Sequence, residues 1–254
     1  MRVRILAFAL AAASCFAAHE GGSRERTFVQ ALEAFDRAKS PEDFRRAAEL
    51  FESMLQDGYK NGAVYYNLGN AWMKAGEHGR AIAAYRKAQP FRPRDPYLQA
   101  NLNQALSTAP GKLPPAPQPW WRQVFFWKDW FAIPEKFMVA TALGLIAFLL
   151  ALAALKWTPS RAALNRAALT LAALSVLAGI EASMSWSDAS DTRHAVVVKE
   201  TIARKGNSAE YQAAFDQPLK DGAEFTVLEQ RGDWVFGHFE GAGDAWVPRD
   251  AIVQ

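Results

Sequence analysis

Cysteine and histidine are scarce in this sequence, and their scarcity excludes several kinds of site. The 254 residues include one cysteine, Cys15, and four histidines, none of which lies at metal-ligand spacing from a second ligand. A single cysteine forms no intramolecular disulfide. The glycine loops that bind nucleotides and the nucleophile elbow of hydrolases are also absent. We therefore expect no catalytic residue, no cofactor and no metal, and we classify the protein as a non-enzyme.

The sequence also lacks a large excess of positive or negative residues. The chain has 29 Lys and Arg against 26 Asp and Glu, and the resulting net charge of +3 is too small to indicate nucleic-acid binding. Half of the residues are hydrophobic, and these are concentrated in separate segments rather than spread evenly. Together with the length, this segregation predicts a multidomain membrane protein.

The first seventeen residues have the pattern of an export signal. Arg2 and Arg4 precede an uncharged apolar stretch at 5–18, which is too short to span a bilayer. We expect cleavage after Ala17, so residues 1–17 form a signal peptide and the mature chain has no cysteine. Lipidation of Cys15 is the alternative, although Leu10 lies two positions too far upstream for that signal.

Residues 24–107 have apolar residues at helical spacing, which predicts an all-α domain. Ser40 followed by Pro41 is a helix start, because Ser caps a first turn and Pro suits its first position. Glycines separate the segments. The five predicted helices cover 24–38, 41–57, 62–76, 79–91 and 95–107.

The second helical pair has small and large residues at a regular spacing: Tyr65, Leu68, Gly69, Trp72, Ala81, Tyr85, Ala88 and Pro93. This spacing resembles that of one complete tetratricopeptide (TPR) repeat, in which small residues at two positions allow the helices to approach closely. Ala47 and Phe51 precede Ala81 and Tyr85 by 34 residues, which indicates a degenerate repeat upstream, and Leu102 is placed for a capping helix.

The TPR resemblance implies a peptide-binding surface on the concave face of the array. Side-chain amides on that face would hold the backbone of an extended peptide. Asn67 and Asn101 have an alternative role, which is to link helices within the array. The residues expected on this face are Tyr66, Asn67, Asn70, Met73, Lys74 and Asn101.

Two unusual segments follow the helices. Residues 108–119 contain five prolines and are expected to form an extended, semi-rigid linker. Residues 120–136 begin with four tryptophans in twelve positions, directly before an apolar run. Because tryptophan favours the membrane–water interface, we interpret this segment as an interfacial aromatic belt.

Two apolar segments are expected to form a transmembrane hairpin. Residues 137–155 carry no charge, and residues 167–186 carry only Glu181. The basic loop at 156–166 contains no acid and is therefore expected in the cytoplasm. We therefore expect the protein in a bacterial inner membrane, with both soluble domains on the periplasmic side. Glu181 is costly in lipid, so we expect it to contact a basic residue on a partner's membrane helix; the alternative is that it reaches the membrane interface or is protonated.

The C-terminal segment at 193–254 has strand periodicity. Strands are predicted at 195–198, 224–229, 233–236, 245–247 and 252–253. The second half resembles an SH3 fold through Asp221-Gly222, Val227-Leu228, Trp234, Gly237, Trp246-Val247-Pro248 and Ile252.

This resemblance implies a small all-β SH3-like barrel. Trp234 and Pro248 match two positions that SH3 domains use against polyproline ligands, whereas Ala251 replaces the family's tyrosine. The alternative for Trp234 is a role in the core alone.

The order of all these segments resembles that of the BatE proteins, the TPR component of the bacterial aerotolerance (Bat) operon. The resemblance implies protein partners, namely von Willebrand factor A (VWA) domain membrane proteins and, indirectly, a MoxR-type AAA+ ATPase. It implies no biochemical activity. Three hypotheses follow: a membrane-anchored scaffold, a module that binds peptidoglycan through the SH3-like domain, and an accessory subunit of an enzyme.

Overall fold

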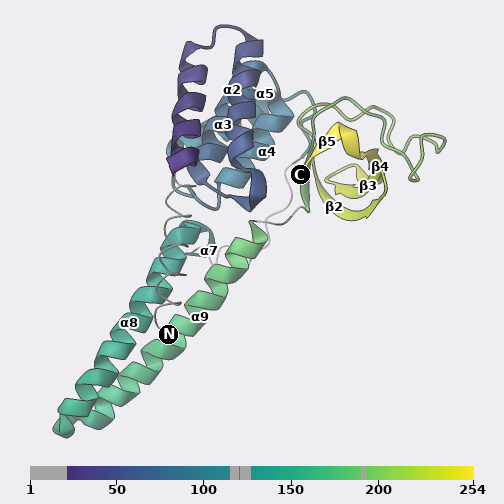
Figure 1. Ribbon diagram of the computed structural model, residues 1–254. Helices are drawn as coiled ribbons and strands as arrows, with labels where there is room; N and C mark the ends of the chain where they lie inside the picture. Colours follow the sequence, from purple (N-terminus) through teal and green to yellow (C-terminus); the bar gives the residue numbers. More distant parts are fainter. Residues whose placement is uncertain (1–21, 115–119, 121–126, 190, 192) are drawn as a thin grey trace, which may run out of the picture.

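The computed structural model describes the whole chain except residues 1–21, 115–119, 121–126, 190 and 192 (Figure 1). The predicted signal peptide at 1–17, with Cys15, lies outside the described residues. So do parts of the predicted proline-rich and aromatic segments.

A helical array forms the N-terminal part of the described chain. Residues 22–37 are helical, and four further helices follow. Each boundary predicted from the sequence lies within three residues of the observed one. The helices are α2 (Pro41–Met54), α3 (Gly62–Ala75), α4 (His78–Ala88) and α5 (Pro96–Thr108), with a 3-10 turn, η1 (Gln56–Gly58), after α2.

Local residue chemistry sets the ends of these helices. The Ser40 side chain accepts a hydrogen bond from the amide of Asp43, and the Asp43 carboxylate accepts one from the amide of Ser40, so α2 begins with a capping box. At the other end of α3, Gly76 takes a left-handed conformation with φ of 82°. Glycine adopts this conformation without steric cost and ends the helix.

The closest approach within the array is between α3 and α4. A Cβ atom on Gly69 would lie 2.5 Å from two ring carbons of Tyr85. Tyr85 is fully buried at this contact, and so is Ala81 on the same helix. The helices can pack this closely only because position 69 has no side chain.

Two long apolar helices follow the array. After the short α7 (Trp127–Trp130), α8 (Ile133–Lys156) and α9 (Arg161–Asp188) run antiparallel, joined by the turn η2 (Thr158–Ser160) (Figure 1). Both are long and apolar enough to cross a membrane. The predicted spans 137–155 and 167–186 lie within them, but the helices are longer and leave a shorter loop than 156–166. Most of the residues buried along these two helices are small: Ala140, Ala147 and Ala154 on α8, and Ala168 and Ala182 on α9.

The C-terminal part is a five-stranded antiparallel sheet with strand order β4-β3-β2-β1-β5. Every strand predicted from the sequence overlaps an observed one. Alternate residues point into an apolar core that includes Phe225 and Phe239, whose rings stack at 4.5 Å. The strands are β1 (His194–Val197), β2 (Glu224–Arg231), β3 (Trp234–Phe239), β4 (Gly243–Pro248) and β5 (Ile252–Val253), with the turn η3 (Arg249–Ala251) before β5.

The sheet packs against α4 of the helical array (Figure 1). Val196 of β1 is buried in the apolar core of the array rather than in that of the sheet. Arg86 donates two hydrogen bonds to Glu224, of 2.8 Å from Nε and 3.0 Å from Nη2. The sheet and the array are therefore in direct contact.

Glycine allows the two backbones to meet at this contact. The amide of Gly79 donates a 3.0 Å hydrogen bond to Oδ1 of Asp221. A Cβ atom on Gly79 would lie 2.4 Å from the carbonyl oxygen of Val197. Burial raises the pKa of the Asp221 carboxyl, and the hydrogen bond from Gly79 opposes that shift.

The described start of the proline-rich segment also packs on the sheet. The amide of Gly111 donates a 2.8 Å hydrogen bond to the carbonyl oxygen of Asp221, and Leu113 packs against the core of the sheet. Residues 108–119 were expected to form an extended spacer. In its described part, residues 108–114, this segment is docked, because Leu113 finds apolar partners that composition alone does not reveal.

Candidate functional site

Helix α3 positions most of the residues expected to bind a peptide. Asn61 caps its first turn by accepting hydrogen bonds from the amides of Ala63 and Val64, and Gly76 ends it. Residues three, four and seven apart lie on one side of a helix. Tyr66, Asn67, Asn70, Met73 and Lys74 therefore share a side of α3.

Asn70 lies in a hydrogen-bond network that joins three helices. Its Oδ1 accepts a 2.8 Å hydrogen bond from the hydroxyl of Tyr85 on α4 and a 2.8 Å bond from Nδ2 of Asn101 on α5. Asn101 also donates to the hydroxyl of Tyr66, at 3.2 Å. Burial raises the pKa of the Tyr85 phenol, so Tyr85 stays neutral and donates its proton.

This network assigns a structural role to two of the candidates. The Asn70 oxygen accepts two hydrogen bonds from within the array, which uses both of its lone pairs. The side-chain amide of Asn101 donates both of its hydrogen bonds to residues of α3. The sequence offered helix linking as the alternative for Asn101, and the contacts follow that alternative. For Asn70 the sequence had suggested peptide binding alone, because the partner hydroxyl of Tyr85 comes from a different helix.

Asn67 and Lys74 are placed differently. Neither side chain forms a hydrogen bond or ion pair with any residue that the structure describes, and Lys74 is exposed. They are two turns apart on α3 and lie on the same line along the helix. We call these two residues the α3 surface. Met73 packs partly into the core next to it.

An aromatic and cationic contact borders the site. The guanidinium of Arg92 lies 4.7 Å from the centre of the Tyr66 ring, which is within the range of a cation–π interaction. Arg92 also forms an ion pair with Asp95. Tyr66 is therefore held on both sides, by Arg92 and by Asn101.

The outer face of the sheet carries the second group of candidates. Trp234 and Pro248 are direct partners in the β3–β4 register, and both are half-buried. The next pair on this face, Phe236 and Trp246, has ring centres 5.1 Å apart. Trp234 is half-buried, and it is not among the residues that form the apolar core of the sheet. Phe236 was not predicted as part of this face, although it lies two residues after Trp234 on the same strand and alternation places both side chains on one side.

Glu181 has its partner within the same chain. Nζ of Lys136 lies 2.9 Å from Oε1 of Glu181 and 2.8 Å from Oγ of Ser185, and it donates a 2.7 Å hydrogen bond to the carbonyl oxygen of Lys128. The sequence suggested a basic residue on another chain. The reason for the difference is the antiparallel pairing of α8 and α9, which brings Lys136 opposite Glu181.

A sequence signal for this pair existed. Lys136 lies 22 residues before Thr158 and Glu181 lies 21 residues after Ser160, so a tight turn at 158–160 places them side by side. Lys136 is buried, whereas Glu181 keeps 38% of its side-chain surface exposed. The pair therefore holds the two helices together near the end that faces the helical array.

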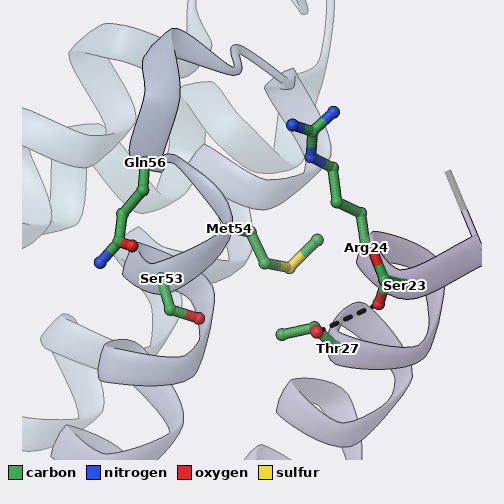
Figure 2. A pocket seen from close by; sticks show the side chains of 6 residues that line it. All are labelled: Ser23, Arg24, Thr27, Ser53, Met54 and Gln56. Carbon is green, nitrogen blue, oxygen red and sulfur yellow. Dashed lines mark hydrogen bonds between the residues drawn. The ribbon is translucent and has the colours of Figure 1, made fainter. Parts of the chain in front are cut away.

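A small cavity lies apart from these groups. It has a volume of about 120 Å³ and is formed between the helix at 22–37 and the end of α2 (Figure 2). Its lining is mainly polar, and the Thr27 hydroxyl in that lining donates a 3.1 Å hydrogen bond to the carbonyl oxygen of Ser23. No candidate residue lines it. The residues that do are Ser23, Arg24, Thr27, Ser53, Met54 and Gln56.

Comparison with known protein families gives a match for one part of the chain. Residues 38–105, from just before α2 into α5, match the model of the tetratricopeptide repeat family. This part is a TPR region. No curated protein and no solved structure matches the chain.

The TPR match agrees with the repeat read from the sequence, and it associates the region with protein–protein interaction. Among the described residues, no group of His, Cys, Asp and Glu is arranged to hold a metal ion. The candidates for a binding role are the surfaces on α3 and on the sheet.

Proposed function

We propose that this protein is a membrane-anchored adaptor that binds a protein partner through the α3 surface of its TPR region. The main support for this proposal is that the polar groups of Asn67 and Lys74 have no partner among the described residues. An amide can pair with a peptide backbone, and an exposed ammonium favours an acidic segment. The TPR region supplies the helical array that holds them.

The anchor in this proposal is the α8–α9 hairpin, crossing the bacterial inner membrane with the short basic turn in the cytoplasm. The proposal takes residues 1–17 as a signal peptide and 24–107 as the TPR domain, with both soluble domains in the periplasm. The exposed apolar side chains along both helices support it. So does the ion pair between Lys136 and Glu181, which neutralises the one acid of the second span.

The partner that we propose is a membrane neighbour of the Bat type. The segment order resembles BatE proteins, which implies VWA-domain membrane proteins and, indirectly, a MoxR-type ATPase as company. We also propose that the sheet at 193–254 is SH3-like. Five antiparallel strands with a 3-10 turn between β4 and β5 support this assignment.

A second function rests on the outer face of the sheet. Trp234, Phe236 and Pro248 are partly exposed on neighbouring strands, and the buried ring of Trp246 packs against Phe236 beneath them. Aromatic rings offer flat apolar surfaces to peptides and sugar rings. Binding of peptidoglycan through this face is therefore the alternative function.

Capture experiments with the full-length protein in mild detergent separate these functions. Replacing Asn67 and Lys74 together by alanine should abolish co-purification of the partner, while a matched variant with Asn103→Ala and Lys39→Ala, both exposed and outside the α3 surface, should keep it. Helical content should be unchanged in both.

Sedimentation with purified sacculi tests the alternative. If the full-length protein sediments and Trp234→Ala does not, peptidoglycan is a ligand of the sheet. Unchanged partner capture by the Asn67→Ala, Lys74→Ala variant would contradict the proposed role of the α3 surface.

A further inference from the structure

One edge of the TPR region contacts the hairpin where α8 begins and α9 ends (Figure 1). The amide of Ile133 donates a 3.0 Å hydrogen bond to the carbonyl oxygen of Pro90. The rings of Phe91 and Trp186 meet edge to face at 6.1 Å, and Nζ of Lys60 lies 4.8 Å from the centre of the Trp186 ring. Two loops of the array, before α3 and after α4, therefore rest on the hairpin.

A second set of contacts surrounds Arg94. Its guanidinium forms an ion pair with Glu135 in the first turn of α8. The same group lies 5.8 Å from the centre of the Trp130 ring and 6.0 Å from that of Phe131. Arg94 thus joins the loop between α4 and α5 to both the aromatic segment and the start of the first long helix.

Several aromatic side chains at this junction are exposed. Trp130 keeps 53% of its surface accessible, and Phe131 and Trp186 are also exposed. Tyr97, three residues after Arg94 in the first turn of α5, is 73% exposed. Tryptophan and tyrosine next to basic side chains are the composition that proteins place at a membrane–water interface.

The length of α8 gives the height of this junction relative to a bilayer. The nineteen uncharged residues 137–155 form a helix of about 28 Å, which matches a hydrocarbon core of about 30 Å. The first turn, Ile133–Lys136, therefore lies just outside the core, in a head-group layer about 5–7 Å thick on each side. Pro90 and Arg94 contact this turn directly, so they lie at the same height.

We propose that the membrane-facing edge of the TPR region, formed by Lys60, Phe91, Arg94 and Tyr97, lies in the phospholipid head-group layer. The bilayer is favoured over a protein as the occupant because this surface is continuous with the two long apolar helices. An acidic protein partner is less suited to this surface because its cations are already paired within the chain: Arg94 with Glu135, and Lys60 with the Trp186 ring. This inference rests on the proposed membrane anchoring by α8 and α9.

A functional consequence follows from this placement. The α3 helix begins at this edge, at Gly62, and runs away from it. Asn67 and Lys74 would then be held at fixed distances from the membrane surface. The TPR region would accept segments that approach along the bilayer, such as the juxtamembrane tail of a membrane protein.

Depth-dependent fluorescence quenching in lipid nanodiscs tests the proposal. Full-length protein with Cys15→Ser receives one cysteine for an environment-sensitive dye, at Tyr97, at Leu149 or at Lys39. Tyr97 probes the edge. Leu149 is an exposed residue within α8 and probes the hydrocarbon core. Lys39 is an exposed residue just before the start of α2 and serves as a control away from the edge. The nanodiscs contain phosphatidylcholine with a spin label on the head group or in the middle of the acyl chain.

The expected result is a different response at each position. The dye at 97 should lose intensity mainly with the head-group label, the dye at 149 mainly with the acyl-chain label, and the dye at 39 with neither. Quenching at 149 with none at 97 would overturn the placement of the edge and leave the anchoring intact. Absence of quenching at 149 would contradict the membrane anchoring itself. Protection of position 97 by a co-purified protein would make that protein, and not lipid, the occupant.

Discussion

Replacing Gly69 by alanine should destabilise the TPR region, against the usual effect of that substitution. In an exposed helix interior, Gly→Ala stabilises by about 1 kcal/mol because alanine has the better helix propensity. Here the added methyl would lie 2.5 Å from Cδ1 and Cε1 of Tyr85. Ordinary carbon–carbon contacts are roughly 3.5–4.0 Å, so the helices or the ring would have to move by about 1 Å.

Tyr85 has little room to move. Its side chain is 1% exposed, and its hydroxyl is bonded to Asn70. Overpacking a tightly packed core costs about 1–3 kcal/mol, which outweighs the gain in propensity. A short array has few other contacts to compensate. We expect a lower melting temperature, since 1 kcal/mol corresponds to about 4–8 °C in a domain of this size.

Thermal unfolding of the full-length protein in mild detergent, followed by far-UV circular dichroism, measures the effect. Gly22→Ala is the matched control, because a Cβ atom there has open space in the helix at 22–37, and it should melt like the parent or slightly higher. In a Tyr85→Leu background the cost of Gly69→Ala should largely disappear, since the ring that the methyl meets is gone. A Gly69→Ala variant that melts like Gly22→Ala would refute the close packing of α3 against α4.

Three further predictions concern the hairpin and the sheet. Lys136→Met should destabilise the hairpin in detergent because it leaves the Glu181 carboxylate without its cation, and adding Glu181→Gln should recover most of the loss; equal melting of the single and double variants would contradict this. Because burial raises the pKa of Asp221, the folded state binds this proton more tightly than the unfolded chain. Stability should therefore fall as pH rises through the raised pKa, and Asp221→Asn should flatten that part of a stability–pH curve. For the proposed topology, alkaline phosphatase fused after Gln254 should be active and a fusion at Leu164 inactive, whereas the reverse pattern would invert the topology.

The sequence alone was sufficient where neighbouring residues decide the structure. The helix start at Ser40, the TPR repeat around Gly69 and the strands of the C-terminal sheet were predicted within a few residues. These features depend on capping, on the spacing of small and large residues and on alternation of apolar positions, all of which are local. The two long apolar helices were likewise evident from composition.

Tertiary structure decided which polar groups are available. Asn67 and Asn70 are both asparagines on one side of a predicted helix. The Asn70 side-chain oxygen accepts hydrogen bonds from Tyr85 and Asn101, whereas Asn67 has no partner in the described chain. Glu181 finds Lys136 only because α8 and α9 pair antiparallel. Such assignments depend on residues far apart in the chain, whose approach is set by the packing of whole helices and strands. Local periodicity carries no information about that approach.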